Sequence, residues 1–348
     1  MAELRRDPIT GRWIIVQTDH PDTPKDYVYE PNIIKGEGDC PFCYGSESMT
    51  PPEIEVCREP STNPNTPGWG VRVVANRFPA LQIEGDIGRR GSGMYDLSNG
   101  VGAHEVLIET PYHFKDFPDL TDQEVAAVFS MAIRRSLDLM RDKRFKYIMI
   151  FKNYGYEAGA SIEHPHSQII ALPMVPKNVM EEIKGAQSYF DYRERCLFCD
   201  ILLQEKEEKK RIVAENDHFL AFCPYVSRFP FEVWVIPKVH NGYFCNMPDN
   251  ERLPLASVMR TLVTKIKKVF PNMAYNFIIH SSPVNGDSSG REDYHWHIEF
   301  IPKLTRVAGF EWGTGFYMIP TSSEDAAAYL NEEDKVRTIN KEITQQDV

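Results

Sequence analysis

Apolar residues in this chain occur in short runs, and polar segments rich in Pro and Gly separate these runs. The length of the runs and their β-branched and aromatic content are typical of strands. Two longer segments, 122–141 and 255–270, place apolar residues at helical spacing, and Thr121 with Glu124 forms a capping-box pattern before the first. The expected strands are 13–16, 71–75, 105–109, 147–151, 169–173, 231–237 and 275–279. The pattern therefore predicts a mixed fold of strands and helices.

The remaining segments are expected to be connections or short helices. Residues 51–67 and 84–102 are rich in Pro, Gly and polar side chains, which is typical of loops. A helix at 177–192 is expected to link two parts of the chain, and a last helix is expected at 324–330. The tail after Asn331 is expected to be solvated.

The order of these elements occurs twice along the chain. The repeated features are the Cys-x-x-Cys pairs at 40–43 and 196–199, the helices at 122–141 and 255–270, the strands at 147–151 and 275–279, and the His-x-His motifs at 164–166 and 295–297. An internal duplication explains this order most simply. We therefore expect an α+β protein of two tandem α/β halves with antiparallel sheets, divided into residues 1–175 and 176–348.

Composition excludes some classes of function. The net charge of −11 argues against a nucleic-acid partner, which usually needs a basic face, but it leaves room for a phosphorylated small molecule. The apolar runs are far shorter than the ~20 residues of a membrane helix. The first residues contain no apolar export signal. A cytoplasmic protein with no membrane partner is expected.

Four of the seven cysteines form the two Cys-x-x-Cys pairs. Each pair is followed by a histidine just past a strand and by another histidine on a later strand, and zinc prefers such a tetrahedral set of thiolates and imidazoles. The expected sites are Cys40, Cys43, His113 and His164 for site one, and Cys196, Cys199, His240 and His295 for site two. Four protein ligands leave no open position, so the two zinc ions are expected to be structural. A buried or redox-active thiol pair is the alternative for either Cys-x-x-Cys taken alone.

If His164 is a zinc ligand, His166 is free for chemistry. A turn containing Gly159 and Ser161 precedes it and can offer backbone N–H groups to a phosphate. A neutral imidazole can attack phosphorus and form a phosphohistidine-type intermediate. Alternation along a strand places Gln168 on the same face, where its amide can donate to a non-bridging phosphate oxygen. The alternatives are that His166 is a further metal-site histidine or an ordinary core residue.

The motif His164-Pro-His166-Ser-Gln168, preceded by Asn153 and by Gly159-Ala-Ser161, resembles the active site of galactose-1-phosphate uridylyltransferases. These enzymes are the duplicated branch of the histidine-triad superfamily. The resemblance extends to the segments 7–13, 40–43, 76–78 and 309–311 and to His113, and so spans most of the chain. It implies ping-pong chemistry: UDP-glucose gives a uridylyl-histidine and glucose 1-phosphate, and galactose 1-phosphate then takes the uridylyl group.

The resemblance also implies roles for individual residues. His166 is the nucleophile, and Gln168 and Ser161 contact the transferred phosphoryl group. The residues implied at the nucleotide and hexose sites are Phe42, which flanks the base, Asn76, Asn153 and Gly159 around the nucleotide, and Phe310 and Glu311 near the hexose. In the family the last two come from the partner in a homodimer, so a UDP-sugar, a hexose 1-phosphate and a second copy of the chain are the expected partners.

Three departures from the family pattern keep alternatives open. The stretch after the first strand, 16–24, lacks the two phosphate-contacting arginines of the family. Ser167 replaces the usual glycine and also occurs in relatives that transfer adenylyl groups. Many members hold iron in the second site with the help of a glutamate, whereas this chain offers Cys196 and Cys199, so zinc is expected there with iron as the alternative.

The sequence therefore favours uridylyl transfer between UDP-glucose and galactose 1-phosphate. One alternative is an ADP-sugar or dinucleotide phosphorylase that works through an adenylyl-histidine. An alternative of another class is a zinc-containing protein that binds nucleotides without chemistry.

Overall fold

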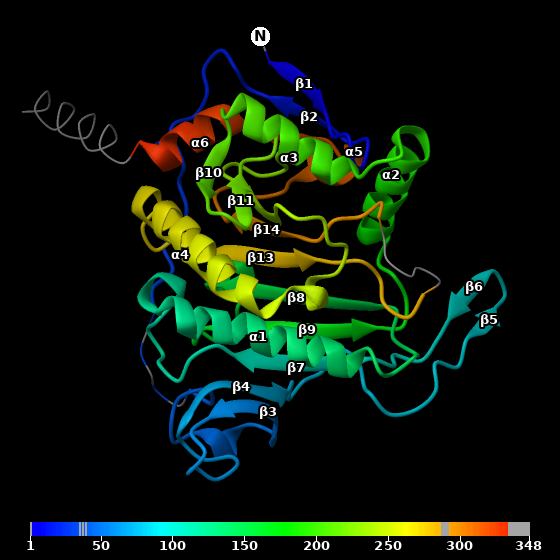
Figure 1. Cartoon of the computed structure of the whole chain (residues 1–348), viewed down its shortest axis with the longest axis vertical. Coiled ribbons are helices and arrows are strands. Elements are labelled where there is room, and N and C mark those ends of the chain that lie inside the picture. The colour runs from blue at the N-terminus through cyan, green and yellow to red at the C-terminus, as the bar shows by residue number, and fades with distance from the viewer. Residues whose placement is uncertain (1, 35, 37, 39, 287–291, 333–348) are drawn as a thin grey trace, which may run out of the picture.

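One antiparallel sheet of ten strands runs through the computed structural model, in the order β10-β11-β12-β14-β13-β8-β9-β7-β4-β3 (Figure 1). The structure describes residues 2–34, 36, 38, 40–286 and 292–332. The tail expected to be solvated lies, from residue 333 on, outside these residues. The two halves meet where β8 pairs with β13, so the duplication builds a single sheet instead of two.

The strands of the large sheet agree with most of the expected runs. They are β3 (Glu53–Arg58), β4 (Trp69–Ala75), β7 (Ala103–Ile108), β8 (Tyr147–Tyr154), β9 (His166–Leu172), β10 (Ile212–Glu215), β11 (Phe219–Phe222), β12 (Val233–Pro237), β13 (Tyr275–His280) and β14 (His297–Pro302). A smaller sheet contains β1 (Glu3–Arg6), β2 (Trp13–Val16) and β15 (Tyr317–Ile319), and β5 (Arg90–Ser92) pairs with β6 (Tyr95–Leu97). The α+β expectation is confirmed.

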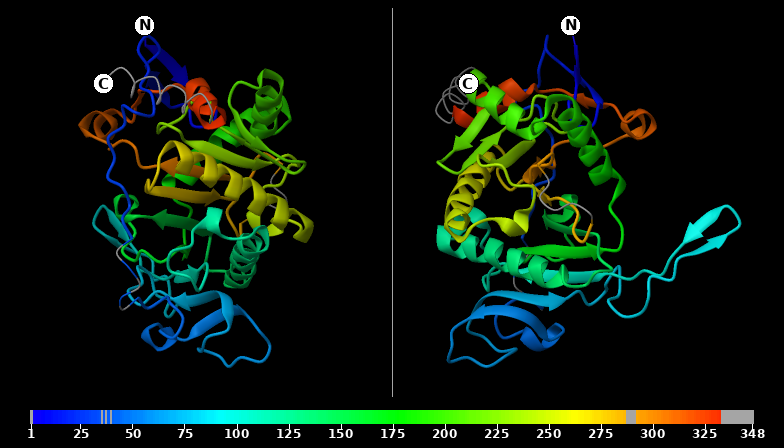
Figure 2. Two further views of the ribbon diagram at one scale, coloured as in Figure 1. Left: turned by 90° about the vertical axis from the view of Figure 1, so that its left-hand side faces the viewer. Right: turned by 45° about the vertical axis from the view of Figure 1, so that its right-hand side comes forward.

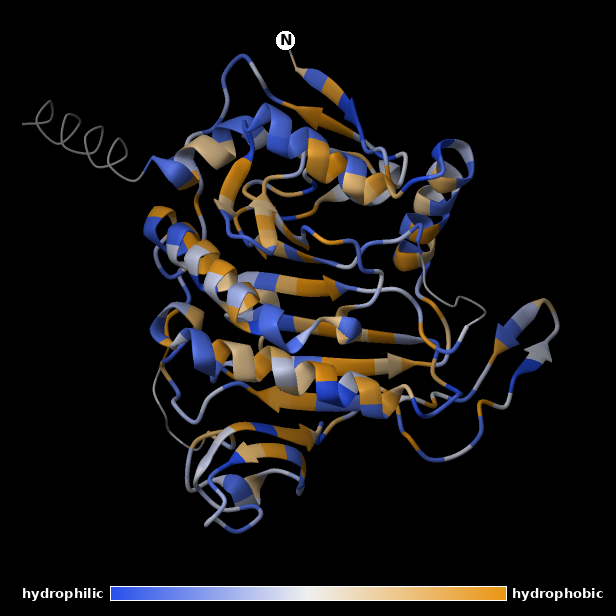
Figure 3. Cartoon of the chain, viewed as in Figure 1, coloured by the Kyte–Doolittle hydropathy of each residue, from blue (hydrophilic) through white to orange (hydrophobic). Residues whose placement is uncertain are grey.

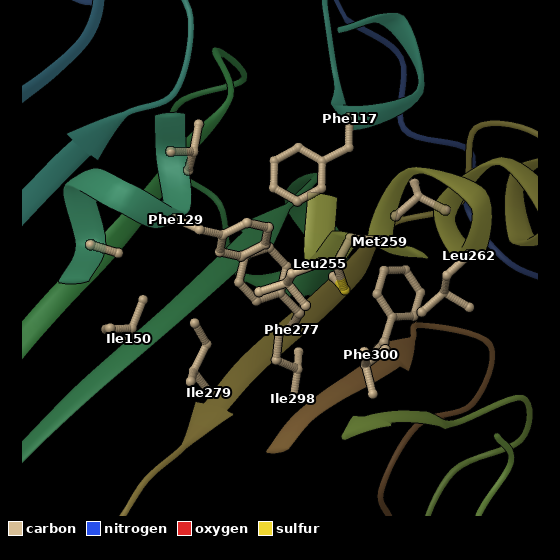
Figure 4. Packing of buried hydrophobic residues seen from close by; sticks show 14 of the residues in the cluster. Phe117, Phe129, Ile150, Leu255, Met259, Leu262, Phe277, Ile279, Ile298 and Phe300 are labelled. Carbon is tan, nitrogen blue, oxygen red and sulfur yellow. The ribbon is translucent and has the colours of Figure 1, made fainter. Parts of the chain in front are cut away.

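Helices α1 (Asp122–Leu139) and α4 (Arg252–Val269) cover one face of the large sheet side by side. Thr121 caps α1, since its hydroxyl accepts from Glu124 N and the Glu124 carboxylate accepts from Thr121 N, as expected. The apolar sides of both helices and the alternate residues of the strands form one core, shown in Figure 4. Figure 3 shows that polar and apolar residues alternate along both helices. The other face of the central strands is left free to carry polar side chains.

The remaining helices lie around the second half. They are α2 (Lys177–Arg193), which links the halves as expected, α3 (Leu197–Glu208), α5 (Gly309–Thr314) and α6 (Ser323–Asn331). Among the described residues, no helix combines the length and apolarity needed to cross a membrane.

Several elements differ from the expectation. Residues 51–67 contain β3, and residues 84–102 contain the β5–β6 hairpin, which projects from the body of the molecule (Figures 1 and 2). Helices α3 and α5 and strands β1 and β15 were also not expected. Polar residues in β3 and β1 hide the alternation that is typical of strands. These strands form because β3 pairs with β4 and β1 pairs with β2.

A buried ionic cluster joins the two halves beneath the central strands. Lys152 on β8 donates from Nζ to Glu109 at 2.6 Å and to Asp116 at 2.8 Å. From the second half, Lys267 pairs with Asp116 at 2.7 Å, and the Tyr275 hydroxyl donates to the same carboxylate at 2.7 Å. Burial alone would raise the pKa of Asp116, but the charges of the two lysines outweigh burial and lower it. The carboxylate is therefore ionised and shared across the junction.

Replacing Asp116 with Ala is expected to leave the buried lysine charges without a counter-charge. The free energy of unfolding is expected to fall by about 3–5 kcal/mol, as measured by urea denaturation. As a control, Asp249→Ala removes a carboxylate that is 90% exposed and paired with Arg252, and about 1 kcal/mol or less is expected. Equal losses in the two variants would contradict the role given to the cluster.

Candidate active site and metal centres

Strand β9 presents the predicted nucleophile on the face of the sheet opposite α1 and α4. In the pairing of β9 with β7, His166 lies opposite Ile108, Gln168 opposite Val106, and Ile170 opposite His104. The alternate residues of β9 pack into the helix-covered core. His166 and Gln168 therefore share one face, as the alternation predicts.

The ring of His166 is fixed in one tautomer. Its Nδ1–H donates to the carbonyl oxygen of His164 at 2.8 Å, which leaves the lone pair on Nε2. Within the described part of the chain Nε2 makes no hydrogen bond. Burial is the largest cause that lowers the pKa of His166, to about 4, so the ring is neutral at pH 7. A neutral imidazole with an available Nε2 is a competent nucleophile.

An aromatic ring and a polar cluster border this imidazole. Phe42, inside the first Cys-x-x-Cys, meets His166 edge to face at 5.3 Å between ring centroids. On the other side of β9, Ser167 donates to the buried carboxylate of Glu109 at 2.6 Å. Lys152 bonds the same carboxylate, so the β9 backbone beside the nucleophile is tied to the buried ionic cluster.

The turn between β8 and β9 holds the other predicted polar residues. Gly155 and Gly159 have φ of 86° and 89°, values that favour glycine. Asn153, on β8, accepts a hydrogen bond at Oδ1 from Asn276 Nδ2 at 2.8 Å, and Asn276 also donates to Ala158 O at 2.9 Å. A pocket of about 360 Å³ opens beside the turn, and Gly155 and Ser161 belong to its lining.

Site one brings together the four predicted ligands, whose nitrogen and sulfur atoms all lie within 4.8 Å of one another. His164 Nδ1 lies 3.7 Å from Cys40 Sγ and 3.5 Å from Cys43 Sγ, and His113 Nδ1 lies 3.4 Å from Cys43 Sγ. Tetrahedral zinc with ordinary Zn–S and Zn–N bonds sets neighbouring ligand atoms roughly 3.5 Å apart. His164 Nε2–H donates to Thr110 O at 2.7 Å, which turns the Nδ1 lone pair toward the thiols. The residues fit zinc.

Site two assembles in the same way. Cys196, Cys199, His240 and His295 have their candidate ligand atoms within 4.8 Å of one another. Cys199 Sγ lies 3.5 Å from His240 Nδ1 and 3.6 Å from His295 Nδ1. Two thiols and two imidazoles match the preference of zinc.

The second half also contains a counterpart of His166, but its surroundings are closed. His297 Nδ1–H donates to His295 O at 3.1 Å, as His166 does to His164. Trp234 and His280 stack on the His297 ring at 4.9 and 4.8 Å between centroids. The cavity beside it measures only about 30 Å³. This half therefore has the histidine without room for a nucleotide.

A third cluster consists of Glu182, His280 and His297, for which no role was expected. His280 Nδ1 donates to Glu182 at 3.0 Å, and its Nε2 lies 3.3 Å from Glu299. Burial favours the neutral ring, but the two carboxylates outweigh it and raise the pKa of His280 to about 10. In this structure the cluster is an ion pair around a charged imidazolium. Arg228 completes it by pairing with Glu299.

Not all predicted site residues come together within one chain. Phe310 and Glu311 lie on α5, beside β1 and β2 and several strands away from β9 (Figures 1 and 2). Glu311 accepts from Ala308 N at 3.0 Å, within its own helix turn. Trp312, on the same helix, is 79% exposed.

Two polar residues near the site were missed in the sequence. Asn276 fixes the amide of Asn153, and His104 contacts the amides of both Gln168 and Asn76. The signal for His104 was available, because it begins a strand on which 104, 106 and 108 share one face. Asn276 gave no comparable signal, since its neighbour Asn153 comes from the other half of the chain.

Comparison with known proteins agrees with this geometry. The family model described as galactose-1-phosphate uridyl transferase, N-terminal domain, matches residues 2–176, and the model of the C-terminal domain matches residues 182–345. An ADP-glucose phosphorylase of Arabidopsis thaliana is 34% identical over 334 residues, which cover 95% of this chain and 92% of the relative. A galactose-1-phosphate uridylyltransferase of Thermotoga maritima is 29% identical over 340 residues, which cover 95% of this chain and 98% of the relative.

Solved structures give the same result. The crystal structure of an ADP-glucose phosphorylase from Arabidopsis thaliana with bound ADP-glucose matches with a TM-score of 0.79 and 32% identity, over 95% of this chain and 99% of that one. A uridylyltransferase structure matches with a TM-score of 0.74 and 27% identity, over 96% and 98% of the two chains. The resemblance found in the sequence is confirmed. Since the two family models together span nearly the whole chain, this protein belongs to the galactose-1-phosphate uridylyltransferase family of nucleotidyltransferases.

Proposed function

We propose that the protein transfers a nucleotidyl group from a nucleotide sugar to a phosphate acceptor through a covalent intermediate on His166. The observation that carries this proposal is the state of the His166 ring. Its Nδ1–H is bound to the His164 carbonyl, it is neutral at pH 7, and Nε2 is available on the face shared with Gln168.

In the first half-reaction Nε2 of His166 attacks the α-phosphorus of the nucleotide sugar. The N–P bond forms, the bond to the bridging oxygen breaks, and the sugar 1-phosphate leaves with the electron pair. The ring becomes positive, and its Nδ1–H bond to the His164 carbonyl strengthens as it does so. The Gln168 amide and the Ser161 hydroxyl donate to the non-bridging oxygens, where negative charge is held.

In the second half-reaction an oxygen of the acceptor phosphate attacks the same phosphorus. The N–P bond breaks, and its electron pair returns to Nε2, which restores the neutral ring. The neutral imidazole is a good leaving group, since the pKa of His166 lies well below its ordinary value. In this proposal Phe42 flanks the base and Asn153 lines the nucleotide site.

Two nucleotide sugars are candidates for the nucleotidyl donor. Uridylyl transfer between UDP-glucose and galactose 1-phosphate is supported by relatives such as that of Thermotoga maritima. ADP-glucose with inorganic phosphate as acceptor is supported by the 34% identical relative and by Ser167, which relatives that transfer adenylyl groups share. The absence of arginine from 17–24 removes a further feature expected of uridylyl transfer. We favour the adenylyl donor, a reversal of the preference drawn from the sequence.

Incubating the protein separately with ADP-glucose and UDP-glucose, without acceptor, tests both points by intact mass. The favoured proposal predicts an adduct of one adenylyl group with ADP-glucose, which inorganic phosphate discharges as ADP. A uridylyl adduct alone, discharged by galactose 1-phosphate, would support the other donor. The absence of an adduct with either nucleotide sugar would favour the alternative of nucleotide binding without chemistry.

A matched pair of variants tests the nucleophile. His166→Gln is expected to abolish the adduct while zinc content and melting temperature stay near those of the wild type. His297→Gln removes the corresponding histidine of the second half, and it is expected to retain the adduct because that site is closed. An adduct on His166→Gln would overturn the assignment.

We further propose that zinc occupies both Cys/His sites and that the chain divides near residues 175–176 into two halves with one zinc each. The donor sets and their spacing support this. Zinc would hold His164, whose carbonyl orients His166, and so would fix the nucleophile without touching substrate. The cysteines of the chain are free, and free thiols are typical of a reducing compartment, which supports a cytoplasmic location.

Elemental analysis is expected to find close to two zinc ions per chain. Cys196→Ser is expected to lower this to about one ion and to destabilise the second half, because metal binding contributes to folding. His164→Ala is expected to lose the zinc of site one and the adduct together. A folded, active protein with no metal would contradict the ligand assignment, and iron in the second site would correct its identity.

We also propose that a homodimer completes the hexose site. The exposed aromatic residues of α5 support this, since Phe310 and Trp312 are 39% and 79% exposed and Glu311 is remote from His166 within one chain. A second copy would bring them to β9 of its partner.

Mixing two inactive variants tests this arrangement. His166→Gln and Glu311→Ala are expected to be inactive or strongly impaired alone. After subunit exchange a mixed dimer contains one site with both residues intact, so turnover should reappear. If sedimentation shows a monomer, or if mixed dimers stay inactive, the proposal fails.

A further inference from the structure

His104 sits at the start of β7, on the same face as the predicted nucleophile and diagonal to Gln168 in the pairing of β7 with β9. Its side chain is half-buried, and it links two parts of the site. His104 O accepts from Asn76 N at 2.9 Å, and His104 Nδ1 accepts from Ala80 N at 3.1 Å. The loop 76–80 is therefore bound to His104 through both backbone and side chain.

The hydrogen bond from Ala80 fixes the tautomer of this ring. A backbone N–H can only donate, so Nδ1 must carry the lone pair and Nε2 the hydrogen. His104 Nε2–H then donates to Gln168 Oε1 at 2.7 Å. The Gln168 carbonyl oxygen must face His104, and its NH₂ group must face the other way.

The neighbouring amide of Asn76 is oriented by the backbone of its own loop. Asn76 Oδ1 accepts from Phe78 N at 2.9 Å, which leaves Nδ2 on the side of His104, 3.1 Å from Nε2. Both nitrogens carry hydrogens, so this contact is not a hydrogen bond. The NH₂ group of Asn76 is left for a ligand.

We propose that His104 is a positioning residue that sets the orientation of the Gln168 amide, so that an N–H instead of a carbonyl oxygen faces the transferred phosphoryl group. An amide side chain can rotate by half a turn at little cost, and in the wrong orientation its oxygen would repel the phosphate. The Ala80 N–H can only donate, so it fixes the hydrogen on His104 Nε2. That hydrogen in turn fixes the orientation of the Gln168 amide. The inference rests on the proposed function, because it assigns how Gln168 serves that reaction.

Two substitutions separate this role from a structural one. The amide atoms of Asn lie as far from Cβ as Nδ1 does, so His104→Asn can still accept from Ala80 but cannot reach Gln168. The amide atoms of Gln lie as far from Cβ as Nε2 does, so His104→Gln can reach Gln168 but loses the bond to Ala80. The rate to be measured is that of adduct formation in a single turnover at saturating nucleotide sugar.

His104→Asn is expected to slow this step by on the order of 10-fold or more, below the 10²–10³ that removal of a whole oxyanion donor costs, with little change in substrate binding. His104→Gln is expected to lose less than His104→Asn, because its amide can still donate to Gln168 Oε1 although Ala80 no longer fixes its orientation. A residue that only holds the loop predicts the reverse order, with the loss in KM instead of kcat. That reverse order, or equal rates for His104→Asn and the wild type, would overturn the proposal.

A double-mutant cycle gives an independent measure. If His104 acts through Gln168, adding His104→Asn to Gln168→Ala should cause no further loss of rate. A loss that multiplies in full would overturn the proposal. Should His104→Asn fail to fold, Ala80→Pro removes the N–H that fixes the tautomer at an exposed position, and a slower step is expected; an unchanged step would count against the proposal.

The matched control is His218→Gln. His218 lies between β10 and β11, at the far end of the sheet, and an unchanged rate is expected. Wild-type protein that forms no adduct would refute the proposed function itself. An adduct in the wild type with the wrong order among the His104 variants would refute this inference alone.

Discussion

The hydrogen bond from His166 Nδ1 to the carbonyl oxygen of His164 is the interaction on which the proposed chemistry depends. It selects the tautomer, frees Nε2 and counters the charge that develops on the ring. The carbonyl can do this only while the backbone of His164 is fixed. Its side chain is held between two thiols and the Thr110 carbonyl, so the proposed zinc acts on the reaction through the backbone, two residues away from the nucleophile.

The buried ionic cluster supports β9 from the other face. Ser167 donates a hydrogen bond to Glu109, and Lys152 pairs with both Glu109 and Asp116. From the second half, Lys267 pairs with Asp116 and the Tyr275 hydroxyl donates to it. The second half of the chain thus stabilises the strand that carries the nucleophile in the first half. It also supplies Asn276, which orients Asn153. A single half would lack these contacts, so the second half contributes to the geometry of the site as well as to stability.

The two halves have diverged in what surrounds an identical backbone motif. His297 makes the same hydrogen bond as His166, but Trp234 and His280 stack on the His297 ring. His280 also forms ion pairs with Glu182 and Glu299 beside this ring. In the first half Phe42 meets the ring at its edge and a glycine-containing turn stays open. The pocket beside this turn measures about 360 Å³ and the cavity beside His297 about 30 Å³, although both halves present a histidine of the same tautomer.

The sequence by itself determined the repeated order of elements, the Cys/His sets and the shared face of His166 and Gln168, because these follow from local periodicity and from spacing along one strand. It also indicated the family, which the comparisons confirm. Tertiary structure alone decided that the two halves form one sheet, that β3 and α3 exist, and that Trp234 and His280 stack on His297 while Phe42 meets His166 at its edge. It also decided the partners of His104, Asn276 and His280, since each is set by atoms that come from distant segments. Hydrogen-bond direction and burial arise between segments that pack together, and no pattern along a single segment contains them.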